Sequence, residues 1–496
     1  MKKHILMATT ALAIGFAAPV AAQDDFAGFS EGIIAMAQSQ GATISFDTRN
    51  VGADGSVELV DFKMIAPDNE ASISADWIKG VPSATTPGQV TFTLSPNASV
   101  TINDPETGKH VINISNDGLV VTLDGITSGQ SAPVLDFSVM ANSIGVTSGN
   151  PADSIIKALD ISFTNFSQTV SLTTATMLLA GETGLAALNM NYDLDLGQSD
   201  GTMASNGQLA DLKIAFQVIA NDNEKNFLDY LSGATTAFVE LSSGASSATV
   251  KILNDDARIA YSGTSTGASI VARAENGYLN ITQESEETQY SFSEFNVDGM
   301  PLPPFDVSLD QLRINLSTPT VNHGSFETAN AEIALRNVVV SESIYSMFDP
   351  TQNIPHSPIN IVANLDANVQ PKIDWANPEA AMMSGNPADF AEVQNITINE
   401  VLITAGGAEI TAEGGATIDN SMGFPFPTGK VTITAGGVQA LVNGLVAMGL
   451  IPQDQAGMAM GMMMAFARPG ANAGEFISDI EFSPQGVTAN GVPLPM

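Results

Sequence analysis

The chain has no cysteine and few basic side chains. With no Cys among 496 residues, thiol catalysis, thiolate metal sites and disulfide bonds are all excluded. Only 17 Lys and Arg stand against 53 Asp and Glu, which gives a formal net charge of −36. Such a surface repels phosphate groups and cannot build a basic groove, so no nucleic-acid partner is expected.

Long apolar runs are also missing, except at the N-terminus. Lys2 and Lys3 precede an apolar run, and Val20 and Ala22 supply small residues at the −3 and −1 positions of a cleavage site. We interpret residues 1–22 as a secretory signal peptide and expect the mature protein in the periplasm. The run is shorter than the roughly 20 residues that a membrane-spanning helix needs, so no transmembrane segment is expected after cleavage.

Histidine is scarce, and the familiar catalytic motifs are absent. His110, His323 and His356 lie far apart, with no HExxH pair, no Gly-x-Ser-x-Gly elbow and no P-loop. Asp193 and Asp195 alternate with apolar residues, which is typical of a solvated strand face. We therefore expect no metal, no cofactor and no enzyme, and keep a hydrolase with a spatially assembled site as an alternative.

The dominant pattern is alternation of apolar and polar residues with period two, which predicts strands with one buried face. Asp-Gly and Asn-Gly pairs between the runs favour tight turns because these residues tolerate positive φ. Gly406-Gly407 and Gly414-Gly415 are interpreted as hairpin turns too. The clearest alternating runs are 135–139, 190–196, 212–218, 312–316 and 480–482, and the turn signals are 53–55, 116–118, 275–277, 297–299 and 489–491.

Few helices are expected. Residues 25–38 and 223–231 show helical patterns, and the apolar spacing from Val438 to Val446 predicts another helix. A methionine-rich stretch over 455–467 follows it and ends before Pro469. The last two are predicted to form a helical hairpin packed on a sheet.

The methionine-rich stretch has three interpretations. It packs as ordinary core, it contacts lipid or a partner, or its thioethers bind copper(I). We favour packing, then lipid or partner contact, then copper. The candidate residues of a hydrophobic groove or gate are Met458, Met462, Met463, Phe466, Leu441 and Leu445.

The signal peptide and the proline-rich stretches of the sequence suggest that the chain has three parts. They are the signal peptide (1–22), an N-terminal β-rich block with a leading helix (23–300), and a C-terminal β block with the methionine-rich hairpin (301–496). Similar phrases end both blocks, VDGMPLP at 297–303 and ANGVPLP at 489–495.

Several stretches of the C-terminal block resemble an uncharacterised family of Gram-negative envelope proteins, the domain of unknown function twenty-one twenty-five. They are PLPPFDVSLDQLRINLSTP (301–319), SESIYSMFDPTQNIPHSP (341–358), ITAGGAEITAEGGATID (403–419), LVNGLVAMGLIPQDQAGMAMGMMMAFARPG (441–470) and ANGVPLP (489–495). The N-terminal GATISFDT (41–48) is similar to the same pattern. Tyr345 and His356 stand where the family leads us to expect Trp and Arg.

The family is in turn similar to the AsmA-like group of long, curved β-sheet envelope proteins, some of which handle lipids. The resemblance implies an elongated, curved antiparallel sheet with an apolar inner face, a few packing helices and no catalytic residues. We therefore expect a non-enzymatic periplasmic protein whose apolar β groove binds lipid acyl chains or a hydrophobic partner. The alternative is a scaffold in envelope assembly without a ligand.

Overall fold

The computed structural model describes most of the chain after the predicted signal peptide. Its ranges are residues 26–39, 41–67, 69–104, 108–125, 134–148, 156–173, 178–196, 201–219, 236–372, 390–420 and 426–494. The predicted signal peptide and the predicted helix over 223–231 lie outside them. The chain is mainly β, with 69% strand, 28 strands assigned to one antiparallel sheet and four helices among the described residues. The coarse fold prediction is therefore confirmed.

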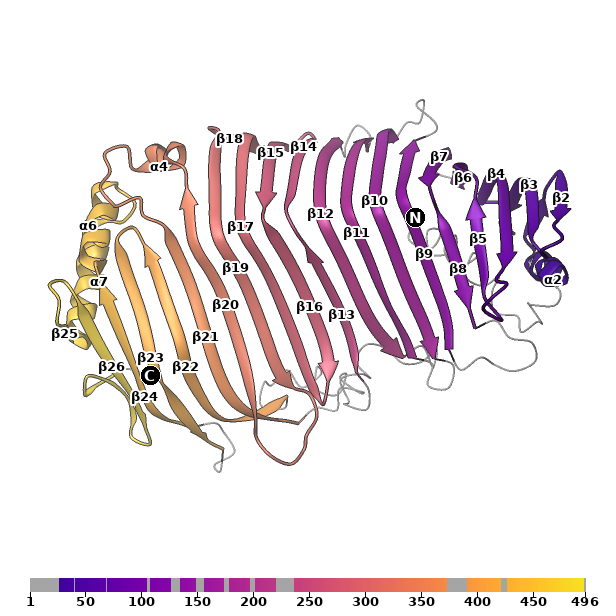
Figure 1. The fold of residues 1–496 in the computed structure, drawn as a ribbon. Helices are drawn as coiled ribbons and strands as arrows, with labels where there is room; N and C mark the ends of the chain where they lie inside the picture. The colour runs from indigo at the N-terminus through magenta and orange to yellow at the C-terminus, as the bar shows by residue number, and fades with distance from the viewer. Residues whose placement is uncertain are drawn as a thin grey trace. The chain divides into compact units, whose positions relative to one another are not determined.

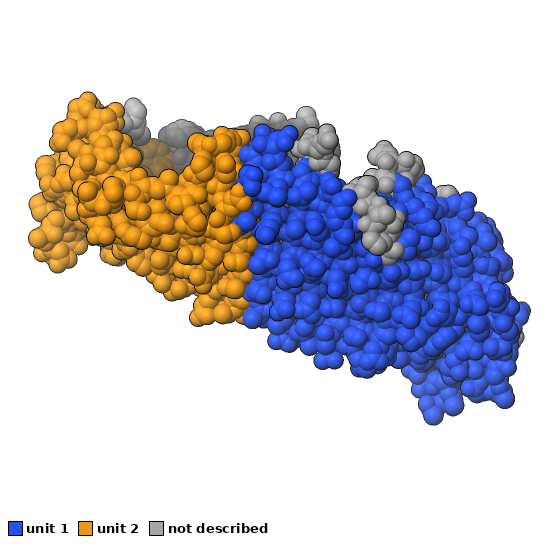
Figure 2. Space-filling view, turned by 90° about the horizontal axis from the view of Figure 1, so that it is seen from above, with its two compact units in different colours: residues 1–222, 241–260 blue, residues 223–240, 261–496 orange. Residues whose placement is uncertain are grey.

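The chain divides into two compact units, coloured in Figure 2. Unit 1 comprises residues 1–222 and 241–260, and unit 2 comprises 223–240 and 261–496. The boundary predicted from sequence at residue 300 falls inside unit 2, at strand β18 (Met300–Leu302).

Unit 1 begins with helix α2 (Phe26–Ser39), as the sequence predicts, and continues as strands. The strands β5 and β6 both pair with β4, and β7 and β8 both pair with β9. Its strands are β1 (Thr43–Ser45), β2 (Thr48–Val51), β3 (Val57–Ile65), β4 (Ala71–Pro82), β5 (Val90–Leu94), β6 (Asn97–Asp104), β7 (Gly108–Asp117), β8 (Val120–Asp124), β9 (Val134–Ser148), β10 (Ile156–Thr173), β11 (Leu178–Asp195), β12 (Thr202–Ile219) and β14 (Ser246–Leu253).

Unit 2 is a meander of long strands with short helices between them (Figure 1). Helix α4 (Glu342–Phe348) follows β20, and α6 (Val438–Ala447) and α7 (Gln453–Phe466) follow β24. Its strands are β16 (Gly267–Glu275), β17 (Tyr278–Val297), β18, β19 (Phe305–Pro319), β20 (Glu327–Val340), β21 (Ile359–Pro371), β22 (Ala391–Ala405), β23 (Ala408–Asp419), β24 (Phe426–Gly436), β25 (Arg468–Pro469), β26 (Phe476–Ser483), β27 (Gly486–Ala489) and β28 (Val492–Pro493). Two of the sequence boundaries between the units fall inside strands, one in β13 (Ala237–Ser243) and one in β15 (Ala257–Ser265).

Most of the predicted hairpin turns are confirmed. Asn276-Gly277, Asp298-Gly299 and Asn490-Gly491 all have positive φ and join paired strands. Gly406-Gly407 turns β22 into β23 in the same way. These pairs fit because Gly, Asn and Asp enter the left-handed region at the lowest cost.

Two predicted hairpin turns are wrong. Gly414-Gly415 lies inside β23, where a Cβ at Gly414 would meet the Lys430 backbone oxygen at 2.2 Å. Glycine is needed there for close backbone approach, not for a turn. Asn116–Gly118 joins β7 to β8. Each of these two strands pairs with a different part of β9, so the turn between them does not close a hairpin.

Several long strands contain a left-handed residue in their interior. In unit 2, Glu287 and Asn337 have φ of 42° and 55°, and both stand across from Asp310 of β19. The Asn337 amide donates to the Asp310 carboxylate (2.8 Å), and its backbone N–H donates to the Asn360 side-chain oxygen (2.8 Å). Short polar side chains tolerate this conformation by bonding locally. The ladder is thus interrupted at the same level in adjacent strands.

Helix α2 packs on strands of unit 1 through its first residue. Phe26 is 3% exposed and packs in a cluster with Val57, Val90 and Leu123. A Cβ at Gly80 would lie 2.6 Å from the Phe26 ring, so only glycine admits the ring there. The apolar first turn of α2 thus anchors the helix to the sheet.

The C-terminal helices dock at the strand ends of unit 2. Ile354, in the loop after α4, lies against Gly444 of α6 so closely that a Cβ there would be 2.3 Å from its side chain. Leu441 of α6 reaches the β22–β23 turn at Gly406. Helices are present at both predicted places, α6 and α7, and α6 docks on a turn and a loop.

The Gly444 contact generates a paired prediction. Gly444→Ala should destabilise the docking of α6 by about 1–3 kcal/mol, because the added methyl overpacks against Ile354. Gly461→Ala in α7 is the matched control, since its Cβ meets nothing within 4 Å. That change should stabilise the helix by up to about 1 kcal/mol. Hydrogen exchange of residues 438–447 in the two variants checks this, and equal protection in both would contradict it.

Candidate functional site

The strands of unit 2 present one face without charge. Neighbouring strands place apolar side chains in the same register rows, for example Ile314 opposite Ile333 and Ile361 opposite Ile403. Across four successive rows, from β16 to β26, no register position on this side carries a charged residue. We call this side the apolar face; its exposed members are Ile270, Ile314, Leu316, Ile333, Ile361, Ile396 and Ile403, each 38–48% exposed.

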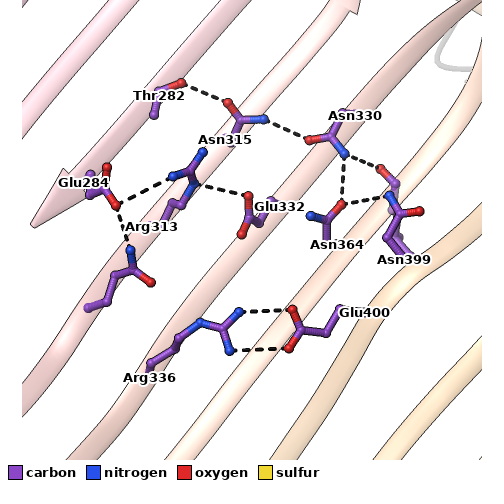
Figure 3. Close-up of polar contacts among 12 residues, drawn as sticks. Thr282, Glu284, Arg313, Asn315, Asn330, Glu332, Arg336, Asn364, Asn399 and Glu400 are labelled. Carbon is purple, nitrogen blue, oxygen red and sulfur yellow. Dashed lines mark hydrogen bonds and ion pairs between the residues drawn. The ribbon is translucent and has the colours of Figure 1, made fainter.

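The opposite face of the same strands carries a hydrogen-bonded polar network (Figure 3). Thr282 donates to Asn315, Asn315 donates to Asn330, and Asn330 donates to Asn364, at 2.8, 2.8 and 2.9 Å. Asn399 then donates to Asn364 at 3.1 Å. The chain of amides therefore crosses β17, β19, β20, β21 and β22.

Ion pairs lie beside the amides on this polar face. Arg313 is 3.6 Å from Glu284 and 3.2 Å from Glu332, while both arms of Arg336 reach Glu400 at 3.0 and 3.3 Å. Exposed pairs of this kind stabilise a fold by roughly 0–1 kcal/mol each. Their main consequence is the placement of these charged side chains, which lie together on the polar face.

The exposure of the two faces is the reverse of what their composition suggests, because aliphatic side chains are buried on the polar face and exposed on the apolar face. On the polar face, Ala334 and Val362 are 0% and 1% exposed, and Ala334 is the register partner of Arg313. On the apolar face, Ile333 is 43% exposed. Since burying aliphatic surface is favourable, the apolar face is left with unused binding free energy.

A second cluster lies in the loop after α4. Nδ1 of His356 is 2.8 Å from the Glu342 carboxylate, and its Nε2 is 3.4 Å from that of Asp349. Tyr345 stacks on the imidazole, with ring centres 4.0 Å apart and planes at 11°. Asp349 is fully buried and accepts the N–H groups of Asn353 and Ile354 at 2.7 and 2.9 Å.

These contacts shift the pKa values of the cluster. The hydrogen bond to Glu342 raises the pKa of His356, and the same bond lowers the pKa of Glu342. Burial alone raises the pKa of Asp349, but the bonds from Asn353 and Ile354 outweigh it and the pKa is lowered. The cluster therefore places the imidazole between two carboxylates, whose bonds favour its charged form, and fixes the loop that carries Ile354.

The cluster brings together the two residues that depart from the expected family pattern. The family leads us to expect Trp and Arg at these positions, and the structure places Tyr345 and His356 in a stack. An aromatic ring over a cation is favourable in either combination. Sequence reasoning did not predict the role of Glu342 and Asp349, and only their closeness to His356 along the chain hinted at it.

His323 and His356 of unit 2 have different partners. His356 contacts carboxylates through both ring nitrogens, so neither is left to take a proton from a hydroxyl. His323 pairs with Glu327 at 3.1 Å, and His110 lies on β7 of unit 1. Within the described residues, no group of three or more His, Asp or Glu could hold a metal ion.

The predicted groove or gate residues divide by exposure. Met458 and Met462 are 66% and 55% exposed, whereas Met463 and Phe466 are half-buried. Leu441 and Leu445 are half-buried on α6. The helices thus contribute both to packing and to an exposed apolar surface.

Unit 1 also has a polar and an apolar face. One row that crosses nine strands is polar throughout: Lys63, Ser74, Ser99, Asn113, Thr147, Asp160, Asn191, Asn206 and Thr249. A hollow of about 660 Å³ in unit 1 is lined by members of this row together with Asp61 and Asp76. This hollow is not the apolar groove that the sequence predicts.

The fold and site define a class: a mainly antiparallel-β chain whose strands separate an uncharged face from a charged one. No helix among the described residues is long and apolar enough to cross a membrane. Residues 264–495 match the model of a family described as uncharacterized protein conserved in bacteria (DUF2125). The match covers nearly all of unit 2 after residue 260 and leaves GATISFDT outside.

The other comparisons add little. No curated protein matches. The ferric preacinetobactin receptor BauA of Acinetobacter baumannii is 9% identical, with 79% of this chain and 74% of that one covered and a TM-score of 0.16. The alcaligin outer membrane receptor FauA of Bordetella pertussis is 8% identical, with 89% and 68% covered and a TM-score of 0.14. Likenesses this low carry no argument.

The His356 cluster predicts a pH-dependent stability. Because folding raises the pKa of His356, its contribution is complete below 6.5, the ordinary value, and is lost as pH rises through the folded pKa. Because folding lowers the pKa of Glu342, its contribution is present above 4.5 and is lost as pH falls through the folded pKa. Protection of residues 342–356 from hydrogen exchange should therefore be greatest between these two values.

The matched variant is His356→Gln, which removes the cation. Its relative loss of protection should be large near pH 6 and small near pH 9. A loss of equal size at both pH values would show that packing of the ring, not its charge, holds the loop.

Proposed function

We propose that this protein is a non-enzymatic envelope protein that binds lipid acyl chains on the apolar face of unit 2. The observation that carries the proposal is the exposure of seven large aliphatic side chains on adjacent strands, without a charge among the register rows. Acyl chains match such a face because they need area and offer no hydrogen bonds.

The charge distribution favours lipid over a second copy of the chain. Two chains that each carry −36 repel one another, and pairing their apolar faces would bring that charge together. Acyl chains add no charge to the face. A neutral or zwitterionic head group would remain outside, away from the acidic surface.

The proposal extends to shape and location. An elongated, curved sheet like that of the AsmA-like group would wrap its apolar side around acyl chains. A cleaved signal peptide over residues 1–22 would deliver the protein to the periplasm, where such lipids are handled. Both remain proposals that rest on the sequence and on the resemblance.

Lipid extraction and native mass spectrometry of the purified mature protein test the function directly. Phospholipid or fatty acid bound in stoichiometric amount would support the proposal and identify the class of lipid. A clean ligand-free mass under gentle conditions would overturn it and favour the scaffold alternative, in which the face meets a protein.

A variant tests the location. Ile314→Asn combined with Ile333→Asn should weaken binding of a fluorescent fatty acid by about tenfold or more, because two facing aliphatic side chains each contribute roughly 1 kcal/mol. Met347→Asn on α4 is the control, since Met347 is 53% exposed and lies outside the sheet. Unchanged affinity in the folded double variant would place the ligand elsewhere.

A further inference from the structure

Unit 1 contains a hollow of about 660 Å³ on the polar side of its strands. The residues that line it come from β3, β4, β6, β7 and β9. Since alternate residues of a strand share a face, the polar ones form two neighbouring rows on one side of these strands. The first row holds Lys63, Ser74, Ser99, Asn113 and Thr147, and the second holds Asp61, Asp76, Asn97 and Ser115.

The hollow lies where the pairing of these strands is interrupted. Strand β4 pairs with β6 as far as Ala75 and with β5 from Ile78 onward. Asp61 of β3 stands across from Asp76 of β4, between the paired positions on either side, and has a φ of 54°. Two acidic residues with exposed side chains therefore stand opposite each other at this break.

A buried serine holds the backbone of two lining residues. Ser95, between β5 and β6, is 0% exposed. Its hydroxyl accepts the Asp76 backbone N–H at 3.1 Å and donates to the Asn97 carbonyl at 2.6 Å. The Asn116 amide donates to the Ser95 carbonyl at 2.8 Å. These bonds fix the second row in advance, and such preorganisation favours the binding of a ligand.

The side chains that line the hollow are almost unpaired. Ser74 and Ser99 share a hydrogen bond of 2.8 Å between their hydroxyls. Among the residues that the structure describes, no other hydrogen bond or ion pair joins the side chains of the two rows. In unit 2, by contrast, the side chains of the polar face bond to one another from Thr282 to Asn399. The hollow therefore keeps its hydrogen-bonding capacity for a ligand.

The mixture of groups matches a neutral ligand with many hydroxyls. Asp61 and Asp76 accept hydrogen bonds, Lys63 donates them, and the amides of Asn97 and Asn113 do both. A sugar hydroxyl also donates and accepts, so neighbouring hydroxyls of one ring can pair with neighbouring groups of the two rows. The volume lies in the range of roughly 300–1,000 Å³ that is typical of small-molecule sites.

Other classes of ligand match the hollow less well. An apolar ligand would cover these polar groups without bonding to them, which costs free energy. An anion would meet two carboxylates and only one ammonium group. Within the described residues, no group of three or more His, Asp or Glu could hold a metal ion.

We propose that the hollow of unit 1 binds a neutral mono- or disaccharide, with Asp76 and Asn113 bonding to its hydroxyls. Because the hollow belongs to unit 1, the proposal does not depend on the binding of acyl chains by unit 2. It adds a second class of ligand to the protein.

Saturation-transfer NMR of the purified protein tests the proposal, with glucose, galactose, N-acetylglucosamine, maltose and cellobiose as probes at millimolar concentration. Saturation should be transferred to at least one of these sugars. Asp76→Ala combined with Asn113→Ala should weaken its binding by about tenfold or more, because two hydrogen-bonding side chains are removed and one of them is charged.

Asp160→Ala combined with Asn191→Ala is the matched control. These residues are of the same two types, are exposed and continue the first row, but they do not line the hollow. Sugar binding should be unchanged in this variant. Thermal melting checks that both variants fold, and Asn97→Ala at a single exposed position replaces the hollow variant if that one unfolds.

Two outcomes would overturn the proposal directly: no saturation transfer to any of these sugars, or an equal loss of binding in both double variants. Calorimetric titration with calcium chloride and with putrescine covers a cationic ligand. If either cation binds more tightly than every sugar, and Asp61→Asn combined with Asp76→Asn abolishes that binding, the carboxylates hold a cation and the assignment to a sugar is wrong.

Discussion

The separation of apolar and polar side chains onto opposite sides of paired strands is the constraint on which this structure depends. With a period of two, successive register rows face opposite sides, and a shift of one residue would exchange the faces. Across four rows from β16 to β26, unit 2 keeps charged residues off one side. The strands of this unit therefore carry two chemically different surfaces.

Side chains on the polar face connect neighbouring strands to one another. An amide chain from Thr282 to Asn399 and the pairs formed by Arg313 and Arg336 link neighbouring strands of unit 2. Few large side chains are fully buried among the described residues, the largest being Val90 and Val362. Stability therefore depends on ladders and cross-strand contacts more than on a deep core.

The apolar side carries the functional argument because it is covered only in part. Helix α2 packs Phe26 against Val57, Val90 and Leu123 in unit 1, and α7 ends beside the apolar face of unit 2 at Ser478. Seven aliphatic side chains of this face, on strands from β16 to β22, are 38–48% exposed. An acidic protein that collects its charge on the other side can stay dispersed while it offers this face to a neutral, apolar ligand.

The amino-acid sequence alone determined the local features. Alternation identified the strands, Asn-Gly and Asp-Gly pairs identified tight turns, and apolar spacing identified α2 and α6, because each depends on neighbours within a few residues. A methionine-rich stretch that ends before Pro469 identified α7. Sequence reasoning misassigned Gly414-Gly415, since the backbone of β24 that makes these glycines necessary is distant in sequence. The apolar face, the amide network and the contacts of His356 were decided only by tertiary structure. Strand register and loop packing bring those residues together, and single segments do not encode which partners they meet.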